Sequence, residues 1–175
     1  MKSQLSDFIH RWRHTLGYGV HSPLAYRIIK ECVHPDTRYA YYADFIIQSH
    51  SENGDMHRQL RLIVRLINTL HLKKIWMPDC PKVIFKILKK AYPTLDISTA
   101  ATIPKNADFI VLFSNPGTKT QSQLPTDMEE FTIINFSKPD QLETIIKNQT
   151  LTLTASSFTL YIRRPLMQPV GYSLL

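Results

Sequence analysis

The sequence predicts an α/β protein in which a mostly parallel sheet ends in a carboxy-terminal antiparallel hairpin and a helical cap precedes the sheet. Two observations predict this class. Apolar residues recur at helical spacing in the first part of the chain, whereas short β-rich runs alternate with helical segments in the rest. We therefore expect a helical cap over residues 1–54 and an α/β domain over residues 55–175, which together form a single compact unit.

The cap is predicted from its apolar spacing and from helix-start signals. A first helix is indicated by one apolar stripe with helical spacing, which consists of Leu5, Phe8, Ile9, Trp12 and Leu16. Ser22-Pro23 starts a second helix, because Ser is a favoured N-cap and Pro fits the first helical position. That helix is expected to end at His34-Pro35-Asp36, and a short third helix is expected at residues 45–47.

A long helix is predicted from Asp55 to about His71. On one of its faces Arg58, Arg61 and Arg65 recur at i, i+3 and i+7. Because an α-helix rises about 1.5 Å per residue, these arginines form a ridge about 10 Å long. Guanidinium groups neutralise phosphates and aromatic rings stack on bases. The aromatic rings that accompany the ridge are those of Tyr39, Tyr41 and Tyr42. These residues favour nucleic-acid binding, although solvated helix faces and packing tyrosines explain them equally well.

Short apolar runs that alternate with helical segments predict the α/β domain. The expected strands cover residues 74–77, 95–97, 108–113 and 131–136, and helices are expected to begin near residues 79–81 and 138–139. Alternation of this kind implies parallel strands joined by crossovers. Two final runs, residues 151–154 and 158–162, are separated by only three residues, a spacing typical of an antiparallel hairpin.

Charge and composition restrict the function further. Residues 1–90 hold 15 Lys and Arg against 7 Asp and Glu, whereas residues 91–175 hold 6 against 7. The basic amino-terminal half can attract nucleic acid, anionic lipid or an acidic protein.

The compartment is predicted from three features. Two cysteines in apolar segments suit a reducing compartment, no apolar run reaches the length of a membrane span, and the first residues lack a signal-peptide core. We therefore expect a cytoplasmic protein.

One segment resembles a known family. The run Tyr18-Gly19-Val20-His21-Ser22-Pro23-Leu24-Ala25-Tyr26 resembles a signature of bacterial class I S-adenosylmethionine-dependent methyltransferase-like proteins, and residues 158–164 look like the last strand of that group. The resemblance implies a Rossmann-like sheet, here shortened. It also implies that a cofactor, if one is bound, lies at the carboxyl edge of the sheet.

The sequence departs from this family at the expected cofactor turn. That turn, Met77-Pro78-Asp79-Cys80-Pro81, contains two prolines and no glycine, although glycine lets the backbone approach the cofactor closely. Strand two ends without the family's acidic residue, and only about eight residues, 99–106, precede the next strand, although a crossover needs about a dozen. We therefore expect a degenerate methyltransferase-like protein that binds no cofactor, performs no catalysis and acts as an interaction or structural domain.

Two alternatives stay open. The first is an active methyltransferase with a rebuilt S-adenosylmethionine site formed by Met77, Asp79, Cys80, Ser114 and Asn115, with Tyr18 and His21 of the cap facing the substrate. For His21, a packing and capping role is the competing interpretation. The second alternative is a nucleic-acid-binding module that uses Arg58, Arg61 and Arg65. We expect no metal site, because His10 and His14 lack a third ligand at a familiar spacing.

Overall fold

The computed structural model describes residues 2–34, 54–104, 106–113, 130–136, 150–165 and 169–174. The helices are α1 (Lys2–Thr15), α2 (Pro23–Ile28), the π-helix η1 (Ile29–Val33), α4 (Gly54–Leu70) and α5 (Lys82–Ala91). The strands are β1 (Lys74–Trp76), β2 (Asp96–Ser98), β3 (Phe109–Leu112), β4 (Phe131–Asn135), β5 (Leu151–Thr154), β6 (Thr159–Arg163) and β7 (Val170–Ser173). The predicted third cap helix and the helix near residues 138–139 lie outside the described residues.

The strands form one seven-stranded sheet in the order β2-β1-β3-β4-β6-β5-β7. β2, β1, β3 and β4 run parallel to one another, whereas β6 is antiparallel to both β4 and β5. β7 forms the far edge and pairs parallel with β5. The predicted hairpin is confirmed, with Leu153 opposite Leu160 in its register.

The predicted fold class is wrong. The structure is α/β, but its sheet is mixed and is not the shortened Rossmann-like, mostly parallel sheet that the sequence predicts. An antiparallel strand, β6, lies inside the sheet, and β7 adds a parallel edge that the sequence analysis did not include. The segment 170–173 escaped prediction because it is short, follows Pro169 and contains Gly171, and all three features are unfavourable signals for a strand.

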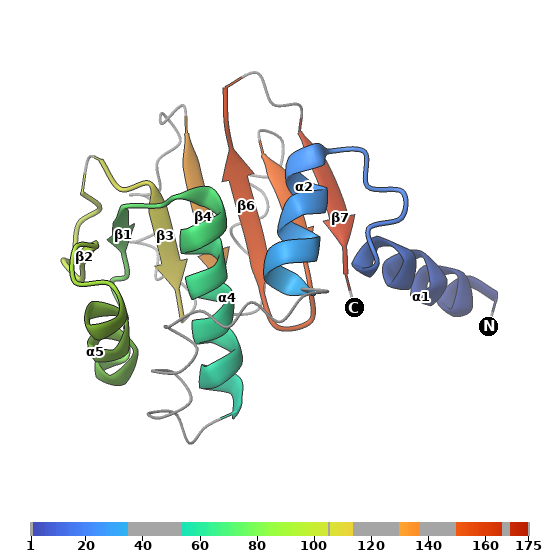
Figure 1. Cartoon of the computed structure of the whole chain (residues 1–175). Helices are drawn as coiled ribbons and strands as arrows, with labels where there is room; N and C mark the ends of the chain where they lie inside the picture. Colours follow the sequence, from blue (N-terminus) through green and yellow to red (C-terminus); the bar gives the residue numbers. More distant parts are fainter. Residues whose placement is uncertain are drawn as a thin grey trace.

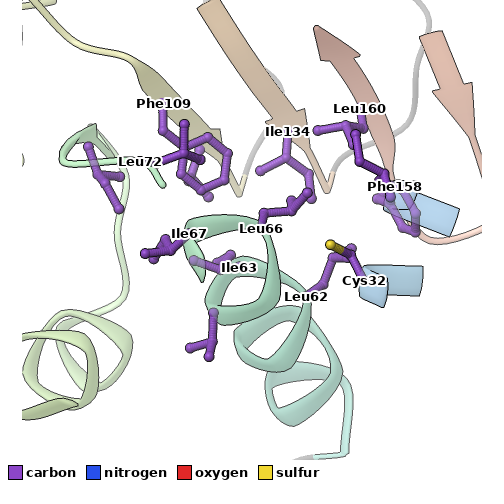
Figure 2. Packing of buried hydrophobic residues seen from close by; sticks show 14 of the residues in the cluster. Cys32, Leu62, Ile63, Leu66, Ile67, Leu72, Phe109, Ile134, Phe158 and Leu160 are labelled. Carbon is purple, nitrogen blue, oxygen red and sulfur yellow. The ribbon is translucent and has the colours of Figure 1, made fainter. Parts of the chain in front are cut away.

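One face of the sheet is covered by α2, η1 and α4 (Figure 1). The apolar side of α4 points toward the strands, and Leu66 lies near Ile134 (Figure 2). Residues of the cap, of α4 and of the strands belong to the same buried cluster, which includes Ile28, Cys32, Leu66, Ile134 and Leu160. Burying a side chain of this size contributes about 1.5–3 kcal/mol, so this cluster holds the helices on the sheet. The predicted division at residue 54 stays a prediction.

The opposite face of the sheet carries a second buried cluster. It contains Trp76, Ile110, Ile133 and Tyr161, all fully buried. The indole N–H of Trp76 donates a hydrogen bond to the carbonyl oxygen of Ala100 at 2.8 Å. This bond ties the loop that leads from β2 to β3 onto the sheet.

The start of α2 follows the predicted chemistry. The Ser22 hydroxyl accepts a hydrogen bond from the backbone N–H of Ala25, and Pro23 occupies the first helical position. The start of α5 lacks such a cap, because Pro81 lies at its N-cap position and supplies no side-chain hydrogen bond.

Among the residues that the structure describes, α1 contacts β7 through its carboxyl end, where the His14 ring meets Tyr172. The helix extends away from the sheet beyond that edge (Figure 1). The side chains of His14 and Thr15 are buried, whereas four residues of the apolar stripe are exposed, namely Phe8, Ile9, Trp12 and Leu16. The spacing therefore predicted the helix correctly without indicating which surface its apolar side covers.

Candidate functional site

A cavity of about 530 Å³ lies at the carboxyl ends of β4 and β5. The amino-terminal half of α4 and the end of η1 form one side, and the residues that follow β4 and β5 form the other. Its lining consists of Cys32, Val33, His34, Asp55, Arg58, Gln59, Arg61, Leu62, Arg65, Phe136, Ala155, Ser157 and Phe158. The volume is in the range of small-molecule sites, about 300–1,000 Å³.

All three predicted ridge arginines line this cavity, because positions i, i+3 and i+7 of a helix share one face. They differ in how they are held. Arg65 donates a hydrogen bond to the carbonyl oxygen of Cys32 at 3.1 Å, which joins α4 to η1. Arg58 is 85% exposed and forms a 3.7 Å ion pair with Asp55, which is 83% exposed. Exposed ion pairs of this kind contribute little free energy. The Arg58 guanidinium can therefore readily turn toward a bound anion.

The cavity wall beside η1 is uncharged at neutral pH. Burial raises the pKa of the Cys32 thiol to about 11, so the thiol stays protonated. Burial and the neighbouring Lys30 ammonium lower the pKa of His34, so its imidazole is neutral at pH 7. A protonated thiol is a poor nucleophile, whereas a neutral imidazole can donate or accept one hydrogen bond to a ligand.

The wall opposite the arginines is apolar. It includes Phe158, which is buried, and Phe136, which is half-buried. The Phe136 ring stacks on Phe113 with ring centroids 5.6 Å apart and an interplanar angle of 20°. Sequence reasoning identified the arginines but not this wall, because residues about 70 to 100 positions away complete the cavity and no local pattern connects them to α4.

The predicted cofactor turn lies elsewhere, at the carboxyl end of β1, and β3 separates β1 from β4 in the sheet. Met77 is fully buried and its backbone N–H donates to Ser98 at 2.9 Å. Asp79 is exposed, and burial raises the pKa of the Cys80 thiol to about 11. Ser114 and Asn115 lie outside the described residues. A rebuilt cofactor site therefore stays a prediction.

The segment 18–26, which resembles the methyltransferase-like family, joins the cap to the last strand, β7. The Tyr172 hydroxyl accepts hydrogen bonds from the backbone N–H groups of His21 and Ser22, at 3.1 and 3.3 Å. Gly17 and Gly19 adopt φ angles of +86° and +76°, which favour glycine. These contacts give the segment a structural role. His21 takes part through its backbone N–H, and the side chains of His21 and Tyr18 are both exposed, so the roles of these two side chains stay predictions.

Of the two histidines of α1, His14 faces the rest of the protein, whereas His10 is exposed. The rings of His10 and His14 are 4.1 Å apart, and the His14 ring meets Tyr172 edge-to-face at 5.4 Å. Within the described residues, no group of three or more His, Cys, Asp and Glu residues could hold a metal ion. In the same part of the chain, no helix combines the length and apolar character needed to cross a membrane.

Comparison with protein-family models, with curated proteins and with solved structures finds no match to this chain. The resemblance to methyltransferase-like proteins therefore stays a prediction from one short segment.

Proposed function

We propose that the protein binds a small organic anion in the cavity between α4, η1 and the β5–β6 turn. The observation that supports this proposal is the arrangement of three arginines opposite a phenylalanine wall. Guanidinium groups bind carboxylate, phosphate or sulfonate with charge-assisted hydrogen bonds. The phenylalanines suit an apolar or aromatic body on the same ligand.

The charge balance of the cavity favours an anion over a neutral or cationic ligand. Three arginines face a single carboxylate, that of Asp55, within its lining. The ligand class we expect is therefore an aryl or acyl group that carries one acidic head. S-adenosylmethionine fits poorly, because its sulfonium and ammonium groups together outweigh its carboxylate.

The state of the ionisable groups favours binding over nucleophilic chemistry. The Cys32 thiol, with a pKa of about 11, is protonated at neutral pH. A binding protein agrees with the sequence-based expectation of an interaction domain without catalysis. This proposal does not depend on descent from methyltransferases.

The concave site also favours a compact ligand over a nucleic-acid strand. A backbone track needs a row of accessible cations, but Arg65 is bonded to η1 and only Arg58 among the three is highly exposed. Nucleic-acid binding remains the alternative, and it predicts an affinity for generic RNA that falls steeply with salt.

Titration with anilinonaphthalene sulfonate tests the proposal, because this fluorescent probe combines an acidic head with aromatic rings. We expect saturable binding to the wild type and competition by phenyl phosphate. The double variant Arg58→Gln/Arg61→Gln should bind about 10-fold more weakly or worse, since one charged hydrogen bond contributes about 1.5–3 kcal/mol. Lys86→Gln, which removes an exposed cation from α5, is the matched control and should bind like the wild type.

Three results would decide against the proposal. Equal probe affinity in the double variant and the control would place the probe elsewhere. Micromolar binding of S-adenosylmethionine in calorimetry would favour the rebuilt cofactor site. Salt-sensitive RNA binding that disappears with Arg58 and Arg61 would favour the nucleic-acid alternative. Near-ultraviolet circular dichroism must stay unchanged in each variant, because the probe also binds loosely packed protein.

A further inference from the structure

We propose that α1 docks on the surface of an anionic lipid bilayer and lies in the headgroup plane with its apolar stripe inserted. This inference rests on the exposure of α1 and is independent of the cavity. Helices that combine Trp, Phe and Leu on one face with Lys or Arg beside it bind membrane surfaces in this orientation.

The exposed stripe is the first part of the argument. Phe8, Ile9, Trp12 and Leu16 are 55%, 45%, 50% and 39% exposed, although they form one continuous apolar face. A contiguous group of large exposed apolar side chains marks an interaction surface rather than an ordinary helix face. Buried residues of the size of Phe and Leu contribute about 1.5–3 kcal/mol each, so covering this face is strongly favourable.

The direction of the stripe is the second part. His14 contacts Tyr172 of β7 and therefore marks the side of α1 that faces the rest of the protein. Trp12 lies two positions earlier, which is about 200° around a helix of 3.6 residues per turn. Ile9, Trp12 and Leu16 thus point away from β7, in agreement with the projecting position of α1 beyond that edge of the sheet (Figure 1).

The charges beside the stripe identify the partner. On a helix of 3.6 residues per turn, Arg13 lies beside Ile9 at one border of the apolar stripe. At the other border Thr15 lies beside Phe8, and Arg11 lies next to Thr15 on the side away from the stripe. Both arginine side chains are exposed. Arginine stems can stay along the apolar surface while the guanidinium groups reach lipid phosphates.

An anionic bilayer fits this pattern better than a second copy of the chain. The protein carries a formal charge of +7, so two copies repel each other while an anionic surface attracts both. Pairing two α1 helices would also bring Arg11 and Arg13 of both copies together. The aromatic residues Phe8 and Trp12 suit the lipid–water interface, where aromatic side chains are enriched.

Vesicle co-sedimentation tests this proposal with the full chain. We expect binding to vesicles of phosphatidylcholine mixed with phosphatidylglycerol, and at least about 10-fold weaker binding to phosphatidylcholine alone, since each arginine near the surface contributes about 1 kcal/mol. Phe8→Ser/Trp12→Ser should abolish binding. Arg11→Gln/Arg13→Gln should remove the preference for phosphatidylglycerol. Val83→Ser is the control, because Val83 is 46% exposed on α5, and it should bind like the wild type.

Tryptophan fluorescence gives a second readout. Trp76 is fully buried, so a blue shift on adding vesicles reports on Trp12, the other tryptophan of the chain. The proposal is overturned by equal binding to both vesicle types, by binding that persists in Phe8→Ser/Trp12→Ser, or by no binding at all. Concentration-dependent dimerisation that Phe8→Ser/Trp12→Ser abolishes, without vesicle binding, would assign the stripe to a second copy instead.

Discussion

α1 and α4 are both amphipathic helices that carry arginines, yet they use their apolar faces in opposite ways. α4 buries Leu60, Ile63 and Leu66 against the sheet, whereas α1 leaves Phe8 and Trp12 exposed beside β7. Apolar periodicity therefore identifies a helix but does not determine whether its apolar side packs within the same chain. The difference shows that α4 belongs to the core and that α1 is available to a partner.

The largest expected effect separates the two helices directly. Leu66 is fully buried on α4, so Leu66→Ala should lower the free energy of unfolding by about 2–5 kcal/mol. Phe8→Ala in α1 should change it by less than about 0.5 kcal/mol, because the side chain is mostly exposed. Urea unfolding followed by circular dichroism measures both. Similar losses in the two variants would mean that the α1 stripe is buried in solution.

The next effect concerns how α1 joins α2. A Cβ added at Gly17 would come within 2.7 Å of the Tyr26 ring, and the φ of Gly17 is +86°. Gly17→Ala should therefore cost about 1–3 kcal/mol and should raise hydrogen exchange in α1 without affecting α4. Gly54→Ala is the matched control, since a Cβ there meets no atom within 4 Å. Unchanged exchange in Gly17→Ala would contradict this account of the junction.

A somewhat smaller effect is expected at the anchor of the cap. Tyr172→Phe removes the hydroxyl that accepts the N–H groups of His21 and Ser22. We expect a loss of about 0.5–1.5 kcal/mol in the stability of the docked cap, the usual net contribution of a hydrogen bond. Hydrogen exchange should rise in residues 8–22 and stay constant in α4. If exchange rises equally in both helices, the cap and the core unfold together.

The smallest expected effect is a dependence of α1 docking on pH. Burial, His10 and Arg13 lower the pKa of His14 below 6.5, while a hydrogen bond that the imidazole donates to the backbone of Ser173 opposes them. The docked state thus binds fewer protons than the released state, so docking is fully present above pH 6.5 and weakens as the pH falls below it. Hydrogen exchange in α1, corrected for intrinsic rates, should rise between pH 7.5 and pH 5.5. His14→Gln should remove this change.

How much of the molecule the sequence predicts depends on how local each signal is. Ser22-Pro23 and the arginine spacing on α4 are local signals, and the helices they predict are present. The sheet depends on pairing between distant segments, and the Rossmann-like class failed because strand runs do not specify their neighbours or their direction. The candidate site is an intermediate case. The spacing on α4 predicts the arginine ridge, but Phe136 and Phe158 come close to the arginines only after the distant strands have paired.

The contact between Tyr172 and His21 has a consequence for synthesis. These residues are 151 positions apart, so during translation α1 emerges long before the strand that anchors it. Domains begin to fold as they leave the ribosome, and exposed apolar surface favours aggregation at that stage. The nascent chain therefore carries an unanchored apolar helix until β7 has been synthesised, and a chaperone or a nearby membrane would meet α1 before β7 does.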